Sequence, residues 1–141
     1  MQRRLLFLLN PRAGVQKGAP LNELIKQKCN AASLAYEIRD TSANADYEWL
    51  CNKISTDHIT DAIVCGGDGT ISAVASSICN LNVNIGIVPR GSGNGLAFAA
   101  GIPKNPEKAL DIILKGNSSF VDAFTINNQF SCMLSGIGFD A

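Results

Sequence analysis

The sequence has no excess of charge of either sign. Its 141 residues include 12 Lys and Arg and 12 Asp and Glu, so the formal net charge at pH 7 is zero. A protein that binds the phosphate backbone of a nucleic acid needs a net basic face, and we therefore expect no nucleic-acid partner. Charged residues make up only 17% of the chain and hydrophobic residues 46%, which excludes a disordered tail and indicates one globular domain.

The sequence also lacks a long apolar run and any cysteine pair with metal-ligand spacing. The run Leu5–Leu9 stops at Asn10-Pro11 and is too short for a membrane span or for the apolar part of a signal peptide. Five cysteines, an odd number with no C-x-x-C pair, argue against a disulfide framework or a zinc site. Each lies in or beside an apolar run, so we expect buried, reduced thiols in a cytoplasmic protein. His58 has no Cys or His near it and is expected to be a solvated loop residue.

The rest of the chain alternates between two apolar patterns. Continuous apolar or extended stretches, which predict strands, occupy residues 5–9, 35–39, 62–65 and 85–88. Apolar residues at helical spacing occupy residues 21–29, 47–54, 71–78 and 109–114. Asn105, Pro106 and Gly116 are typical of the cap, first turn and end of the last helix. The alternation predicts an α/β fold, a three-layer sandwich with a mainly parallel sheet between helices, and then a hairpin within 120–134 that turns at Asn127-Asn128.

Three motifs directly follow predicted strands: Asn10–Gly14, Gly66–Thr70 and Gly91–Gly95. Because ligands of an open parallel sheet bind outside the carboxyl ends of its strands, we expect the three motifs to form one site. Glycine lets a backbone approach a phosphate without a Cβ in the way, and the helix beginning near Thr70 presents unpaired N–H groups to an anion. The chain has no G-x-x-x-x-G-K-[ST] motif and no G-x-G-x-x-G after its first strand. These features predict a polyphosphate ligand, exclude a P-loop and disfavour a Rossmann dinucleotide site.

Asp68 stands inside the second of these motifs. A carboxylate there would repel phosphate unless a divalent cation lies between them or unless the carboxylate takes a proton from an attacking hydroxyl. Either role fits phosphoryl transfer. The alternative is that Asp68 caps the helix that Thr70 opens, because Asp is a preferred capping residue.

Together, the motifs resemble a known family. Gly66-Gly67-Asp68-Gly69-Thr70 is similar to the motif shared by diacylglycerol kinase-like lipid kinases, NAD kinases and phosphofructokinases. With the motifs at 10–14 and 89–97, in this order and spacing, the chain resembles the catalytic domain of diacylglycerol and sphingosine kinases. Residues 138–141 resemble the segment at which that family crosses into its second lobe, and Ser92-Gly93-Asn94-Gly95 looks closer to the sphingosine-kinase version of its motif.

The resemblance implies that residues 1–141 are the ATP-binding lobe of a lipid kinase, with the second, β-rich lobe absent from this chain. MgATP would donate its γ-phosphoryl group to a lipid hydroxyl, such as that of diacylglycerol or a sphingoid base, and the isolated lobe would be inactive. The protein would meet its lipid peripherally at a membrane surface, and a homodimer is compatible with this arrangement. Asp68 would be the candidate base and a candidate magnesium ligand. By motif match, the nucleotide would be lined by Asn10, Pro11, Arg12, Ala13, Gly14, Thr41, Gly66, Gly67, Asp68, Gly69, Thr70, Ile71, Ser72, Ser92, Gly93 and Asn94.

Two alternatives stay open. The first is an NAD kinase-like enzyme or another small-alcohol kinase, which the Asn10-Pro11 motif suits less well. The second is a nucleotide-binding module that does not catalyse a reaction, since catalysis requires closure and exclusion of water by a second lobe.

Overall fold

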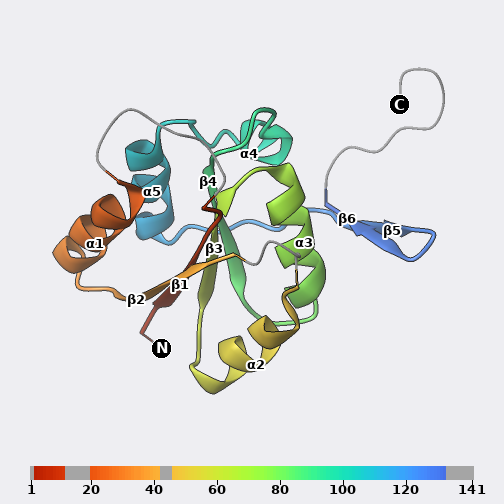
Figure 1. Ribbon diagram of the computed structural model, residues 1–141, viewed down its shortest axis with the longest axis horizontal. Helices are drawn as coiled ribbons and strands as arrows, with labels where there is room; N and C mark the ends of the chain where they lie inside the picture. The colour runs from red at the N-terminus through yellow and green to blue at the C-terminus, as the bar shows by residue number, and fades with distance from the viewer. Residues whose placement is uncertain (1, 12–19, 42–45, 133–141) are drawn as a thin grey trace.

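The computed structural model of the chain describes residues 2–11, 20–41 and 46–132 (Figure 1). Its main sheet has four parallel strands, β1 (Arg4–Leu9), β2 (Ala35–Asp40), β3 (Asp61–Gly66) and β4 (Asn84–Pro89). Their order in the sheet is β2-β1-β3-β4. The helices are α1 (Leu21–Ala31), α2 (Glu48–Thr56), α3 (Asp68–Ile78), α4 (Gly95–Ala99) and α5 (Pro106–Lys115). A separate antiparallel hairpin consists of β5 (Phe124–Ile126) and β6 (Gln129–Ser131).

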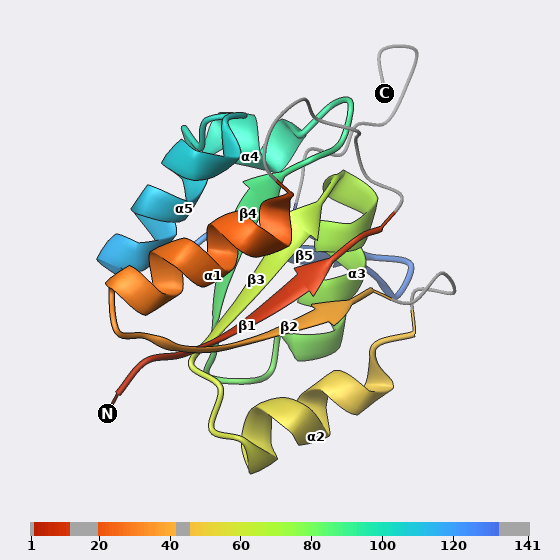
Figure 2. The ribbon, with the colours of Figure 1, turned by 60° about the vertical axis from the view of Figure 1, so that its left-hand side comes forward.

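Helices cover both faces of the main sheet, which confirms the predicted three-layer α/β fold (Figure 2). Leu5 and Phe7 of β1 pack with residues of α1 and α5, whereas Leu6 and Leu8 pack with residues of α2 and α3. All four side chains are 0% exposed. Because successive side chains of a strand point to opposite faces, an unbroken apolar run is what a strand between two helical layers requires.

The end signals predicted for the last helix are confirmed in α5. The Asn105 side chain accepts a hydrogen bond from the N–H of Lys108 at 3.0 Å, and Pro106 is the first residue of the helix. Gly116 ends the helix in the left-handed conformation, with φ 76°. Such a conformation carries little steric cost at glycine.

The predicted hairpin is confirmed, with Asn127 and Asn128 at its turn and both in the left-handed region. Its strands are shorter than the apolar pattern of residues 120–134 indicated, and Phe120 and Val121 are exposed and lie outside them. The hairpin projects away from the main sheet in Figure 1. Helix α4 was not predicted at all.

Two sequence expectations concern the environment of the chain. None of the helices formed by the described residues has the length and apolar character that a membrane span needs. All five cysteines are free, but the expectation that all are buried is wrong: Cys29 and Cys65 are buried, whereas Cys79 is exposed. Cys79 directly follows the end of α3 at Ile78, which is also the last residue of the apolar stripe of that helix.

The strand order determines where the motifs meet. From β1 the chain moves to β2 on one side, and it then crosses to β3 on the other side of β1. In open α/β sheets, ligands bind at such a reversal, outside the carboxyl ends of the two central strands. Asn10 directly follows β1, and Gly66 ends β3. The topology therefore brings the first and second motifs to the same edge of the sheet.

Candidate functional site

The chain segments that leave the main sheet are held in line by backbone hydrogen bonds. The N–H of Thr41 donates to the carbonyl of Leu9 at 2.7 Å, and the N–H of Asn10 donates to the carbonyl of Cys65 at 3.1 Å. Beyond β4, the N–H of Arg90 donates to the carbonyl of Gly66 at 2.9 Å. These bonds extend the parallel ladder past the strand ends, so the motifs begin side by side, as predicted.

Gly66 and Gly67 allow close packing where β3 ends. A Cβ on Gly66 would lie 3.1 Å from the Cβ and Oγ1 of Thr70, and a Cβ on Gly67 would lie 3.0 Å from the Cα of Gly91. Neither glycine has a positive φ, so what they provide is close approach rather than an unusual backbone conformation. A Cβ on Gly69 would meet no described atom within 4 Å. Among the described residues, Gly69 therefore has room for a larger group beside the first turn of α3.

Helix α3 begins at Asp68, earlier than the predicted start near Thr70. Its N-cap residue is Gly67, which has no side chain to cap the helix by a hydrogen bond. The N–H groups of the first turn of a helix have no partners within the helix, and they carry the positive end of its dipole. This end of α3, which includes Gly69, is thus suited to an anion. Thr70, in the same turn, accepts a hydrogen bond from the side chain of Asn10 at 3.3 Å.

Asp68 joins the second motif to the third. Its Oδ2 accepts the N–H of Gly95 at 2.9 Å, and its Oδ1 accepts the N–H of Leu96 at 3.4 Å. Asp68 is half-buried, and a Cβ on Gly93 would lie 3.2 Å from Oδ2. The alternative that Asp68 caps its own helix is therefore wrong. The carboxylate caps α4 instead, and sequence analysis missed this contact because α4 is too short for its apolar pattern to predict a helix.

Asn94 precedes α4 in the left-handed conformation, with φ 56° and ψ 43°. Its side chain is turned toward the backbone of Gly91. Oδ1 accepts the N–H of Gly91 at 2.8 Å, and Nδ2 donates to the carbonyl of Gly91 at 2.7 Å. Asn94 is 3% exposed. Sequence analysis singled out this residue as part of a motif but did not reveal these bonds.

The other predicted site residues differ in how accessible they are to a ligand. The prediction that Ile71 lines the nucleotide is corrected by its position in the core. Its side chain is 0% exposed and its N–H donates to the carbonyl of Gly67, so neither is available to a nucleotide. Thr41 is almost buried and shares a hydrogen bond with Tyr47; burial raises the pKa of Tyr47, and this bond lowers it in part. Pro11, Ser92 and Gly93 are exposed and Ser72 is half-buried, while Arg12, Ala13 and Gly14 lie outside the described residues.

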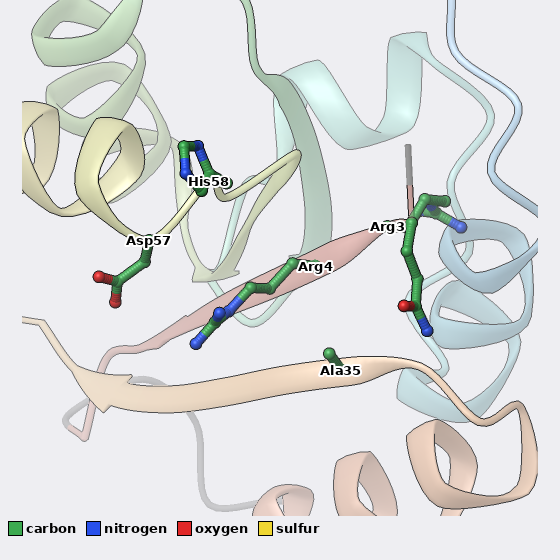
Figure 3. Close-up of a pocket in the computed structure, with 6 residues that line it drawn as sticks. Arg3, Arg4, Ala35, Asp57 and His58 are labelled. Atoms are coloured by element: carbon green, nitrogen blue, oxygen red, sulfur yellow. The ribbon is translucent and has the colours of Figure 1, made fainter.

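A hollow of about 330 Å³ lies at the opposite edge of the sheet, where β1 and β2 begin (Figure 3). Its lining consists of Gln2, Arg3, Arg4, Ala35, Asp57 and His58. His58 is exposed, as predicted. Arg3 donates to the carboxylate of Asp61 and to two carbonyls at the end of α5, so its guanidinium joins β3 to α5. No described residue of the three motifs lines this hollow, which lies at the other end of the strands from them.

Comparison with protein families matches residues 4–126 to the diacylglycerol kinase catalytic domain. The chain belongs to this family. The geometry described above is therefore that of a diacylglycerol kinase catalytic domain, with its glycine motifs at the carboxyl edge of the sheet.

Three relatives illustrate the similarity. A Yersinia pestis protein named "Probable lipid kinase YegS-like" is 30% identical over 88% of this chain and 42% of its own length. An uncharacterized Synechocystis protein is 39% identical over 56% of this chain and 18% of its own. A diacylglycerol kinase from Bacillus anthracis, known from its crystal structure, superposes with a TM-score of 0.72 and 27% identity, over 92% of this chain and 45% of that one. The chain thus spans less than half the length of each of these relatives.

Proposed function

We propose that the chain is the nucleotide-binding lobe of a kinase that transfers the γ-phosphoryl group of MgATP to a lipid hydroxyl, such as that of diacylglycerol or a sphingoid base. One observation carries the proposal. The carboxylate of Asp68 lies where two glycine motifs meet, in the first turn of α3 and at the edge at which open α/β sheets generally bind ligands. Membership of the diacylglycerol kinase family supports the same reading.

The described residues fit a nucleotide phosphate. The N-cap residue of α3, Gly67, has no side chain to occupy the first-turn N–H groups, and no described residue outside this helix lies within 4 Å of a Cβ placed on Gly69. Asn10 and Thr70, which are joined by a hydrogen bond, border the same turn. Phosphate groups bind helix N-termini for these reasons, and we assign the β- and γ-phosphates of ATP to this place.

The described residues also fit a magnesium ion that is shared with the substrate. They contain no cluster of three or more His, Cys, Asp or Glu side chains that would hold a metal ion alone. Magnesium in phosphoryl-transfer sites is commonly bound by one or two carboxylates together with substrate phosphates and water, which a single Asp68 can satisfy. When bound, the ion supplies charge neutralisation. In the proposed reaction, Asp68 either orients the ion or accepts the proton of the lipid hydroxyl.

The remaining parts of the proposal concern the whole protein. Relatives more than twice as long as this chain leave ample length for a second lobe, which would close the site and exclude water. Because the acceptor is a lipid, the protein would meet it at a membrane surface as a peripheral protein.

The test is a phosphorylation assay on the full-length protein that contains this chain. Radiolabelled ATP is supplied with diacylglycerol or sphingosine in vesicles, and in separate reactions with NAD or glycerol. Asp68→Asn is compared with wild type and with Asp111→Asn, which removes the same charge from an exposed residue of α5. We expect wild type and Asp111→Asn to label a lipid, and Asp68→Asn to lose about two to four orders of magnitude in turnover. Label in NAD or glycerol alone would support the small-alcohol kinase, and the absence of nucleotide binding would refute the proposal.

A further inference from the structure

The turn between β4 and α4 contains Gly91 and Gly93, and a third glycine, Gly95, begins the helix. Such a turn loses much conformational entropy on folding and needs specific bonds to hold one shape. The side-chain amide of Asn94 supplies two of them, by contacting both the N–H and the carbonyl of Gly91. These bonds are short and partly buried, and the Asn94 side chain is only 3% exposed, so they are stronger than fully exposed ones.

The same turn contacts the segment around Asp68 at two places. A Cβ on Gly91 would lie 2.7 Å from the Cα of Gly67, the residue before Asp68, so the two backbones touch. On the other side of Asn94, the N–H groups of Gly95 and Leu96 donate to the carboxylate of Asp68. Asn94 therefore lies between the backbone contact and the carboxylate contact.

We propose that Asn94 is a positioning residue for the kinase reaction: its amide fixes the turn from Gly91 to Gly95, so that the first N–H groups of α4 orient the carboxylate of Asp68. This inference rests on the function proposed above for Asp68. It assigns Asn94 a role other than nucleotide contact, since its side chain is nearly buried and is directed at Gly91.

The combination of conformation and bonding explains why an asparagine stands here. Left-handed backbone is tolerated by Asn and Gly but strains most other residues. Glycine would fit the backbone but has no amide. Aspartate would accept the N–H of Gly91 but has no N–H of its own to donate to the carbonyl, and it would place a second negative charge near Asp68.

The test measures kcat and KM for ATP in the full-length kinase with Asn94→Gly and Asn94→Asp. Asn94→Gly keeps the left-handed backbone and removes the amide. We expect its kcat to fall about 100-fold, which is typical of a displaced catalytic group, with KM for ATP within about threefold of wild type. Asn94→Asp, which loses one of the two bonds, is expected to lower kcat about tenfold and serves as the test if Asn94→Gly does not fold. Wild-type kcat in the variants that fold would overturn the proposal.

Asn105→Ala is the matched control, because Asn105 also bonds a backbone N–H three residues away, at the start of α5. Both it and Asn94→Gly should lower the unfolding temperature by a few degrees. Only the substitution at Asn94 should lower kcat. An equal loss of kcat in Asn105→Ala would show that reduced stability explains the effect, and would overturn the proposal.

A double-mutant cycle with Asp68→Asn tests whether Asn94 acts through Asp68. If it does, adding Asn94→Gly to Asp68→Asn should change kcat less than threefold, because the group that it positions is already lost. A further loss of about 100-fold would overturn the proposal.

Hydrogen exchange separates this inference from the proposed function. The N–H groups of Gly95 and Leu96 should exchange faster in both Asn94→Gly and Asp68→Asn than in wild type. This result requires no catalytic activity, so it supports the contact even if no lipid is phosphorylated and the proposed function fails. Unchanged exchange in Asn94→Gly would overturn the inference while leaving the proposed function intact.

Discussion

Of the three glycines in the second motif, Gly66 and Gly67 are in close contacts within the described fold, whereas Gly69 is not. A methyl group there would contact none of the described residues outside its own helix, whereas one on Gly67 would press on the Cα of Gly91. We expect Gly69→Ala to keep or slightly raise stability, because Ala is better than Gly in a helix by about 0.5–1 kcal/mol. If a phosphate occupies this space, the methyl group should lower nucleotide affinity about tenfold or more. Thermal unfolding and calorimetric nucleotide titration measure the two effects.

Gly67→Ala is the matched comparison for that experiment. Because the methyl group at position 67 clashes with backbone rather than with a movable side chain, both the unfolding temperature and the nucleotide affinity should fall. Wild-type affinity in Gly69→Ala would show that no ligand approaches the first turn of α3 at this point.

The cysteines should differ sharply in reactivity. Burial raises the pKa of the Cys65 thiol to about 12, although Arg90 opposes this shift, so Cys65 is protonated at pH 8. Burial also raises the pKa of Cys29. We expect a thiol reagent at pH 8 to modify exposed Cys79 rapidly, and to reach Cys29 and Cys65 only after unfolding.

Two measurements check this order. Cys79→Ser should remove the rapid phase of modification, and mass spectrometry of protein denatured without reductant should find all five thiols free. A disulfide in freshly purified protein, or rapid modification that persists in Cys79→Ser, would contradict the expectation.

At the scale of elements, Arg3 ties the start of the sheet to the end of α5. Its guanidinium lies 2.9 Å from Oδ1 of Asp61 on β3, and it donates to the carbonyls of Ile113 and Leu114. Burial alone would raise the pKa of Asp61, but hydrogen bonds from Arg3, Thr60 and Asn84, with the charge of Arg3, lower it overall. The charged form of Asp61 is therefore favoured in the folded protein.

We expect Asp61→Asn to lower the free energy of unfolding by about 1–3 kcal/mol at pH 7, because a buried charged hydrogen bond is lost. Since the pKa of Asp61 is lowered on folding, its contribution is complete above pH about 4–5, the upper end of the titration of an unfolded Asp. It is lost as the pH falls toward the folded value. Urea unfolding at pH 7 and in acid should therefore show the difference from wild type shrinking at low pH.

An exposed ion pair provides the control for that series. Glu23 and Lys26 pair on the surface of α1, and Glu23→Gln should change stability by less than about 1 kcal/mol at any pH. A difference between Asp61→Asn and wild type that stayed constant through the acid range would contradict the assigned pKa shift.

The elements that sequence analysis predicted correctly are those whose signals are local. A few neighbouring residues are enough to predict β1 from its apolar run, and to predict the ends of α5 from Asn105 and Gly116. Helix α4 has no such signal: its first N–H groups are held by Asp68, 27 residues earlier than Gly95. The motifs could be placed at one edge because parallel strands share a carboxyl end. Their mutual contacts depend on tertiary packing, which spacing does not predict.

At the scale of the whole molecule, the two apolar clusters that cover the sheet faces lie within residues 5–114. The hairpin of β5 and β6 lies outside them, and Phe120, Val121, Phe124 and Ile126 are exposed. We expect a chain that ends at Gly116 to unfold cooperatively, within a few degrees of the 141-residue chain. It should also bind less of a dye that reports exposed apolar surface.

A chain that ends before α5 is the control, because it loses Ala109 and Leu110, both 0% exposed in the core. That shorter chain should lose cooperative unfolding, as followed by circular dichroism during heating. If the chain ending at Gly116 behaved in the same way, the hairpin would have to be counted as part of the core.

The central position of β1 has a consequence for protein synthesis. β1 is translated before both of its neighbours, β2 and β3, and its residues Leu5–Leu8 are 0% exposed in the folded protein. At about 5–20 residues per second, the ribosome completes β3 roughly 3–11 s after β1. During that interval the nascent chain carries an apolar strand with an unpaired edge, the kind of segment that aggregates or recruits chaperones. Translation speed across residues 10–66 thus bears directly on how much of the protein reaches its native state in the cell.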